Sequence, residues 1–224
     1  MLRCPDRLAV IAALFLCLAA AFGLLPPGPT AVPPPFERQL SGGDANGNNI
    51  DDWDDFVAGA RAEATDRTVY RDGYYAGGYP PAGVGVCTDV VWRAFAAAGY
   101  DLKSMVDSDI AGSPEAYPRV DGRPEPNIDF RRVANLLPFF TRHALSLTLE
   151  IVPDDRDNLA QWQGGDIVVF GRPLAHIGII SDRRRPDGVP LLLHNTGPHA
   201  REEDALLSWP TPIVGHFRYP AGRD

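Results

Sequence analysis

The stretch GVCTDVVWRAF at residues 85–95 joins a glycine-containing turn to an amphipathic segment and places Cys87 at the junction. Its apolar residues recur at helical spacing and Gly99 follows as a typical helix end, so a helix is predicted to start near the cysteine. A thiol at a helix N-terminus lies at the positive end of the helix dipole, which favours the thiolate. The stretch therefore predicts a nucleophilic cysteine.

Cysteine usage in the rest of the chain supports this prediction. Cys87 is the one cysteine outside the N-terminal residues 1–25. An exported protein with a single cysteine in its body cannot form an internal disulfide, so the presence of this thiol favours catalysis. The alternative is that Cys87 is a small buried apolar residue, since unpaired cysteines are often buried.

The N-terminus has the features of an export signal. Arg3 and Arg7 precede an apolar run at residues 8–25, and a proline-rich segment follows at 26–35. Residues 1–25 are predicted to be either a cleaved signal peptide or an uncleaved membrane anchor. Because positive charge precedes the apolar run, the body is expected outside the cytoplasm in both cases, in the periplasm or cell envelope. In the second case this segment anchors it to the inner membrane, and no other membrane contact is expected.

Length and charge limit the class of protein. The chain has 224 residues and a net charge of −8, which argues against a nucleic-acid partner. A body of about 190 residues suits one ordinary domain. We expect a Pro/Gly-rich linker at 26–43, a loop and helix at 44–66, and the main domain at 67–220 with an insertion around 101–157. Residues 101–127 are polar and lack periodicity, which predicts an irregular segment.

An acidic loop at residues 44–55 carries oxygen-bearing side chains at the spacing of a calcium-binding loop. Calcium takes about six to eight oxygen ligands on a flexible loop. The loop resembles those of dockerins and thrombospondin type 3 repeats, although Asn49 stands where glycine is usual. The alternative is an Asx-rich turn that caps a helix beginning near Asp51. The predicted calcium is structural, and its expected ligands are Asp44, Asn46, Asn48, the backbone carbonyl of Ile50, Asp52 and Asp55.

The second half of the chain alternates apolar runs with tight turns. Such runs, rich in β-branched residues, predict strands of an antiparallel meander. Helices in the first half and a sheet in the second predict an α+β fold. The expected strands are at residues 145–152, 167–170 (IVVF), 175–182 (AHIGIISD), 190–195 (PLLLHN) and 213–219.

Several short motifs resemble those of a known family. The bacterial domain of unknown function 1287 is similar in the motifs GYPP, GVCTDVVWRAF, NIDFRRV and HNTG, which begin at residues 78, 85, 127 and 194. The order of a helix-start cysteine, GDIVVF at 165–170 and HIGII at 176–180 also resembles the papain-like cysteine hydrolases of the NlpC and CHAP type. The resemblance covers about residues 70–219. It implies that the helix bearing the cysteine packs on the antiparallel sheet bearing a histidine.

The resemblance also implies roles for individual residues. Cys87 matches the nucleophile, His176 the general base and later acid, and His194 the residue that orients the base. The adjacent Asn195 is the alternative third residue, because neighbouring residues of a strand point to opposite faces and only one of them can serve. This chemistry requires no cofactor.

The expected reaction is hydrolysis of an amide bond through a thioester on Cys87, with the oxyanion bound by the Cys87 N–H. Export and the family resemblance together suggest peptidoglycan as the substrate, cleaved as a peptidase or an amidase. Tyr75 and Tyr79 are candidates for the wall of the cleft, with plain packing as the alternative. Two other functions stay open: a calcium-dependent envelope-binding module without catalysis, and a thiol acyltransferase. The sequence leaves the oligomeric state open.

Overall fold

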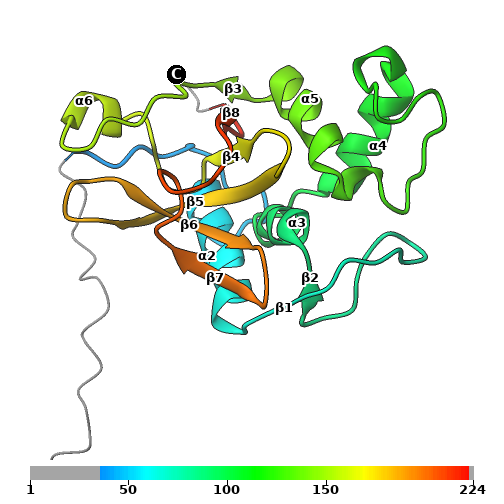
Figure 1. Ribbon diagram of the computed structural model, residues 1–224, viewed down its shortest axis with the longest axis horizontal. Helices are drawn as coiled ribbons and strands as arrows, with labels where there is room; N and C mark the ends of the chain where they lie inside the picture. The colour runs from blue at the N-terminus through cyan, green and yellow to red at the C-terminus, as the bar shows by residue number, and fades with distance from the viewer. Residues whose placement is uncertain (1–35, 222–224) are drawn as a thin grey trace, which may run out of the picture. The chain divides into compact units, whose positions relative to one another are not determined.

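The computed structural model describes residues 36–221 (Figure 1). The predicted signal peptide or anchor at 1–25 and the first part of the linker, 26–35, lie outside the described residues. Within residues 36–221, no helix is both long and apolar enough to cross a membrane.

Four of the five α-helices in residues 36–221 come before residue 145. The first begins where a helix was expected, because the Asp51 side chain accepts a hydrogen bond from the Trp53 backbone N–H and caps the N-terminus. Trp53, Phe56 and Ala60 recur at helical spacing and are buried. The helices are α2 (Asp52–Thr65), α3 (Cys87–Ala97), α4 (Leu102–Gly112), α5 (Val133–His143) and α6 (Arg156–Leu159), with single 3₁₀ turns at Pro114–Ala116 and Asp129–Arg131.

Residues 101–127 contain the helix α4 where an irregular segment was expected. Asp101 caps this helix by accepting a hydrogen bond from a backbone N–H of its first turn. Leu102, Val106 and Ile110 form a buried stripe one residue wide. The expectation was wrong because this narrow stripe lies among charged and small residues, so the surrounding polarity hides its periodicity.

The main sheet has six strands, all paired antiparallel, in the order β3-β8-β4-β5-β6-β7. The predicted meander is confirmed for β4, β5 and β6, which are consecutive neighbours. The last strand instead lies between β3 and β4, and the strand expected at 145–152 is limited to its first residues. The bounds are β3 (Leu145–Ser146), β4 (Ile167–Phe170), β5 (His176–Arg184), β6 (Pro190–Asn195), β7 (Ala200–Glu203) and β8 (Ile213–Arg218), with a separate parallel pair β1 (Val69–Tyr70) and β2 (Val84–Gly85).

The sheet is buried on both faces. Ile177, Ile179 and Leu193 share one hydrophobic cluster with residues of α2 and α3. Ile180 and Leu192, on the opposite face, share a second cluster with Trp162 and other residues of the flanking loops. Burial on both faces explains why β4 is an uninterrupted apolar run rather than an alternating one. The fold is therefore α+β, with the start of α3 brought against β5.

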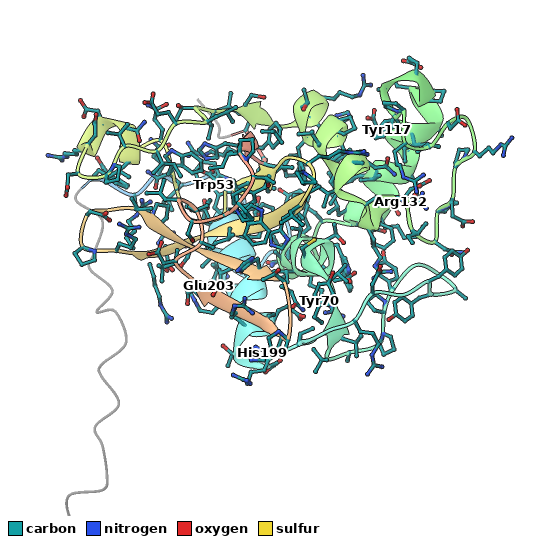
Figure 2. All side chains as sticks on the ribbon, viewed as in Figure 1. Trp53, Tyr70, Tyr117, Arg132, His199 and Glu203 are labelled. Atoms are coloured by element: carbon teal, nitrogen blue, oxygen red, sulfur yellow. The ribbon has the colours of Figure 1, made fainter. Side chains whose placement is uncertain are left out.

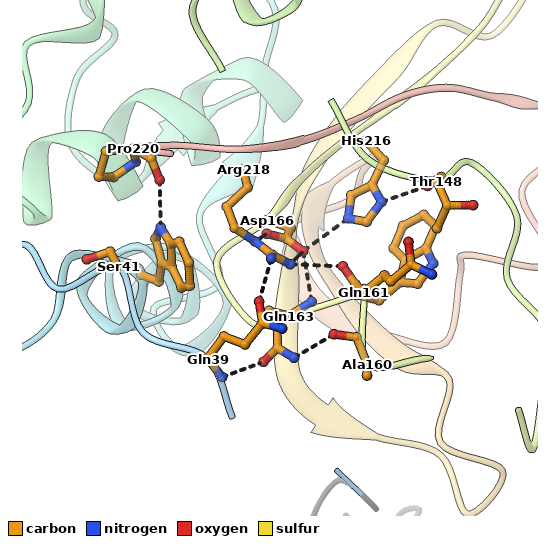
Figure 3. Close-up of polar contacts among 12 residues, drawn as sticks. Gln39, Ser41, Thr148, Ala160, Gln161, Gln163, Asp166, His216, Arg218 and Pro220 are labelled. Atoms are coloured by element: carbon orange, nitrogen blue, oxygen red, sulfur yellow. Dashed lines mark hydrogen bonds and ion pairs between the residues drawn. The ribbon is translucent and has the colours of Figure 1, made fainter. Parts of the chain in front are cut away.

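A polar cluster near the start of α2 joins the N-terminal segment of the domain to its last strand (Figure 3). Asp166, just before β4, is buried and lies 2.7 Å from Arg218 Nε and 3.0 Å from His216 Nε2. Arg218 also donates to the Gln39 side chain at 2.7 Å. The pairing of Asp166 with a cation compensates its removal from water. His216 therefore has a structural role, away from the candidate site.

Candidate active site

Cys87 is the first residue of α3 and is half-buried. The backbone N–H groups of Cys87, Thr88 and Ile177 donate hydrogen bonds to its thiol. The first two belong to the first helical turn, whose N–H groups have no acceptor within the helix. The third comes from β5, which packs on α3. The sulfur is thus held where helix and sheet meet, beside the residue that follows His176.

Burial controls the ionisation of this thiol. Burial raises the pKa of Cys87 to about 11, although the hydrogen bonds from the three backbone N–H groups act in the opposite direction. The expectation that the helix dipole favours the thiolate stays a prediction, because burial acts in the opposite direction. The dipole effect is smaller than the cost of taking a thiolate out of water.

Asp89, in the first turn of α3, is buried and paired with Arg131. Asp89 Oδ1 lies 2.7 Å from Arg131 Nε, and Oδ2 lies 2.9 Å from Nη2. Oδ2 also accepts a hydrogen bond from the Val86 N–H at 2.7 Å, and Oδ1 one from Trp92 Nε1 at 2.8 Å. The carboxylate thus caps α3 while its charge is balanced by a cation from the NIDFRRV motif. This pairing reduces the repulsion that Asp89 exerts on a thiolate two residues away.

The structure brings His176 and His194 together. His176 begins β5, and its Nε2 lies 2.7 Å from His194 Nδ1 on β6. Gly178 makes room for this pair, because a Cβ there would lie 2.9 Å from the Leu193 carbonyl oxygen and 3.1 Å from His194 Cβ. Trp209 stacks on the His176 ring, with ring centroids 4.2 Å apart. No hydrogen bond joins Cys87 Sγ to the His176 ring among the described contacts, and such bonds are often long before substrate binds.

Both imidazoles are neutral at pH 7. Burial lowers the pKa of His176 to about 3, and repulsion from Arg201 and from His194 when it gains a proton acts in the same direction. Burial also lowers the pKa of His194, and it outweighs the opposite effect of the Glu203 carboxylate. The thiol and the histidines therefore form an uncharged group at neutral pH rather than a thiolate–imidazolium pair.

Asn195, the alternative third residue, has a different set of partners. Its Nδ2 donates to the carbonyl oxygens of Thr68 and Gly85, both at 3.1 Å, and its Oδ1 accepts from the Gly197 N–H at 3.2 Å. These bonds join β6 to the β1 and β2 segments. The side chain that contacts His176 is therefore that of His194.

Three further residues at the site were not anticipated. Glu203 and Tyr70, labelled in Figure 2, lie on β7 and β1, and Trp209 follows β7. Glu203 Oε1 is 2.8 Å from His194 Nε2. Burial raises the pKa of the Tyr70 hydroxyl, and the negative charge of a Cys87 thiolate raises it further, so these two groups lie close to each other. The sequence AREE of β7 lacks apolar alternation, so it carries no strand signal and Glu203 could not be placed.

Tyr75 and Tyr79 lie in aromatic packing rather than against the thiol. The Tyr75 ring lies under the Arg131 guanidinium, 5.1 Å from the ring centroid. The Tyr79 ring contacts Trp92 and Phe130 edge-on, and its hydroxyl donates to Asp101 at 3.4 Å. These contacts agree with plain packing rather than with a cleft wall, because Arg131 and the neighbouring rings hold both tyrosines next to the insertion at 101–157.

Most of the predicted calcium-loop residues converge. Asn46 and Asn48 donate through their amide groups to the Asp55 carboxylate, at 2.7 Å and 3.1 Å. Asp44 accepts hydrogen bonds from the N–H groups of Asn48 and Asn49, at 3.0 Å and 2.9 Å. Asn49 has φ 67°, the left-handed conformation for which glycine is usual at this position.

Asp52 does not join this arrangement, and the proposed Ile50 carbonyl ligand stays a prediction. The Asp52 carboxylate is buried and accepts hydrogen bonds from the Ala45 N–H at 2.8 Å and the Tyr100 hydroxyl at 2.7 Å, so both oxygens are engaged. The Ile50 N–H is bound to Asn48 Oδ1 at 2.7 Å. Within residues 36–221, no three His, Cys, Asp or Glu side chains are grouped as metal ligands. The side chains that do converge are the carboxylates of Asp44 and Asp55 and the amides of Asn46 and Asn48.

Comparison with known proteins identifies the family. The family model "Domain of unknown function (DUF1287)" matches residues 57–219. The "Uncharacterized protein YijF" of Escherichia coli (strain K12) is 41% identical over 169 residues, covering 72% of this chain and 78% of that protein. No solved structure matches significantly. The matched range contains Cys87, His176, His194 and Glu203. It shows that the chain belongs to the DUF1287 family.

Proposed function

We propose that the chain is an exported cysteine hydrolase with a papain-like arrangement, cleaving an amide bond through a thioester on Cys87. The observation that carries this proposal is the thiol at the start of α3, which accepts the N–H of Ile177, the residue that follows His176 in β5, while His176 pairs with His194 of β6. A helix-borne cysteine packed on an antiparallel sheet that carries the histidines supports the papain-like placement.

The first half of the reaction forms the thioester. His176 takes the thiol proton as sulfur attacks the amide carbonyl, so an S–C bond forms and the carbonyl electron pair moves to oxygen. We assign the oxyanion to the backbone N–H of Cys87, one of the groups that surround the sulfur. When the oxyanion collapses, the C–N bond breaks and the amine leaves with the proton that His176 held.

The second half restores the enzyme. His176 removes a proton from water, whose oxygen attacks the thioester carbon. The C–S bond then breaks, the acid product leaves, and the sulfur recovers its proton from His176. Because the thiol and imidazole are uncharged before attack, the proton transfer accompanies S–C bond formation rather than preceding it.

Peptidoglycan is the proposed substrate class. The predicted N-terminal leader directs the chain to the periplasm or cell envelope, where the wall contains peptide and amide bonds. The resemblance to NlpC- and CHAP-type hydrolases supports the same class. Cleavage of a stem-peptide bond and cleavage of the amide to the muramyl lactate are both compatible with this site.

Digestion of purified peptidoglycan tests the proposal. The intact chain is compared with Cys87→Ala, His176→Ala and the matched control His199→Gln, and the soluble fragments are identified by mass spectrometry. His199 contacts only a neighbouring carbonyl among the described hydrogen bonds. We expect release of fragments with a new amine and a new carboxylate by wild type and the control, and none by the other variants. Fragments that persist in Cys87→Ala, or absence of any fragment, would contradict the proposal.

We also propose that the loop at residues 44–55 binds a structural calcium ion through Asp44, Asn46, Asn48 and Asp55. The convergence of these side chains and the left-handed Asn49 support it, whereas Asp52 is held by Tyr100 and takes no part. For Asn46 and Asn48 to hold the ion, their amide oxygens would have to face it in place of the amide nitrogens that now bond Asp55. A rise in melting temperature with calcium that is lost in Asp55→Asn is the expected result; an unchanged melting temperature excludes the ion.

A further inference from the structure

We propose that Glu203 is a positioning residue that sets the tautomers of His194 and His176, so that His176 keeps a lone pair on Nδ1, the nitrogen that the proposed general base uses. The catalytic consequence rests on the proposed hydrolase function. The tautomers themselves do not, and they can be measured without substrate.

The geometry is a chain of side chains that crosses three strands. Glu203 Oε1 on β7 lies 2.8 Å from His194 Nε2, and His194 Nδ1 on β6 lies 2.7 Å from His176 Nε2 on β5. Arg201 stands directly opposite His194 in the register of β6 and β7. Glu203, two residues further along, projects from the same face and reaches the same ring diagonally.

Proton counting along this chain leaves one arrangement. A carboxylate can only accept, so His194 Nε2 carries a proton and donates it to Glu203. Because His194 is neutral, its Nδ1 has a lone pair, which accepts the Nε2–H of His176. His176 is also neutral, so its Nδ1 is left with a lone pair. That nitrogen lies on the side of the ring away from His194 and is free to accept a proton in the proposed reaction.

The charges around Glu203 keep it an acceptor. Burial raises the pKa of the Glu203 carboxyl, but hydrogen bonds from Arg201 and His194 outweigh this effect, and the net pKa is lowered. Arg201 Nε lies 2.8 Å from Glu203 Oε1. Without this carboxylate the reverse proton order, with Nδ1–H on His176, becomes accessible. In that order His176 has no lone pair on Nδ1 and cannot take the thiol proton.

The variant Glu203→Gln tests the inference because glutamine keeps the shape of the side chain but can donate as well as accept. Nitrogen-15 NMR of histidine-labelled chain distinguishes protonated from unprotonated ring nitrogens, and His176→Gln and His194→Gln assign the signals. The matched control is Glu202→Gln on the same strand, whose side chain bonds Ser181, Arg61 and Arg183 instead. Melting temperatures of all variants confirm that they fold.

We expect wild type and Glu202→Gln to carry protons on Nε2 of both His176 and His194, and Glu203→Gln to show a new population with Nδ1–H on His176. A proton on His176 Nδ1 in wild type would overturn the inference. Unchanged tautomers in Glu203→Gln would overturn it as well.

Turnover provides the second readout. We expect Glu203→Gln to lower kcat by roughly tenfold or more with KM unchanged, since a misdirected base slows chemistry without weakening substrate binding. The expected tautomers together with no amide hydrolysis by wild type would reject the proposed function while upholding the role of Glu203. Reversed tautomers in an active wild type would reject only the role of Glu203.

Discussion

The ionisation of Cys87 gives the sharpest test of the site. The thiol has a pKa of about 11, compared with 9.0 for a thiol in water. At any pH below both values, that difference leaves about 100-fold less thiolate than in an exposed cysteine. Only about one molecule in 10⁴ carries the thiolate at pH 7. Because alkylation requires the thiolate, it should be slow at neutral pH and should rise tenfold per pH unit up to at least pH 10.

The assay measures iodoacetamide alkylation from pH 5 to pH 10 by peptide-level mass spectrometry, which separates Cys87 from the two cysteines of the leader. The same chain unfolded in urea supplies the exposed reference. His176→Ala should leave the profile nearly unchanged, because an uncharged imidazole does not stabilise a thiolate. A rate that is constant below pH 7 and falls in His176→Ala would show a thiolate–imidazolium pair and refute the reasoning from burial.

Three other changes have defined outcomes. Asp89→Asn leaves the buried Arg131 unpaired and should lower the free energy of unfolding by about 3–5 kcal/mol in urea titrations; a loss below about 1 kcal/mol would contradict this. Gly178→Ala should lower the free energy of unfolding by about 1–3 kcal/mol, and it should also reduce turnover of the folded enzyme, because the new methyl group displaces His194. Unchanged turnover would show that the strands adjust to the methyl group without moving His194. Burial raises the pKa of Asp109, but hydrogen bonds from three neighbouring side chains outweigh this and lower it to about 2, from 3.8. The stabilisation by ionised Asp109 is therefore complete above about pH 4 and lost toward pH 2. Asp109→Asn should make the melting temperature depend less on pH over that interval. An unchanged slope would assign the pH dependence to other carboxylates.

Local patterns predicted much of the site. The apolar spacing after Cys87 indicated α3, and the runs around His176 and His194 indicated β5 and β6, because burial of one helix face or of a whole strand leaves a short-range trace in the sequence. The strand β7 left no such trace, since its residues are partly exposed and charged. Glu203 was therefore missed, although it contacts His194 directly.

The sequence by itself determined which residues can do chemistry and which elements carry them: a thiol at the start of a helix and histidines on apolar strands. Only the tertiary structure decided how those groups ionise and pair. The register of β5, β6 and β7 places His176, His194 and Glu203 in one line, and register depends on contacts between residues far apart in the chain. The pKa of Cys87 likewise follows from burial against β5, because the cost of desolvation depends on everything packed around the sulfur rather than on its neighbours in sequence.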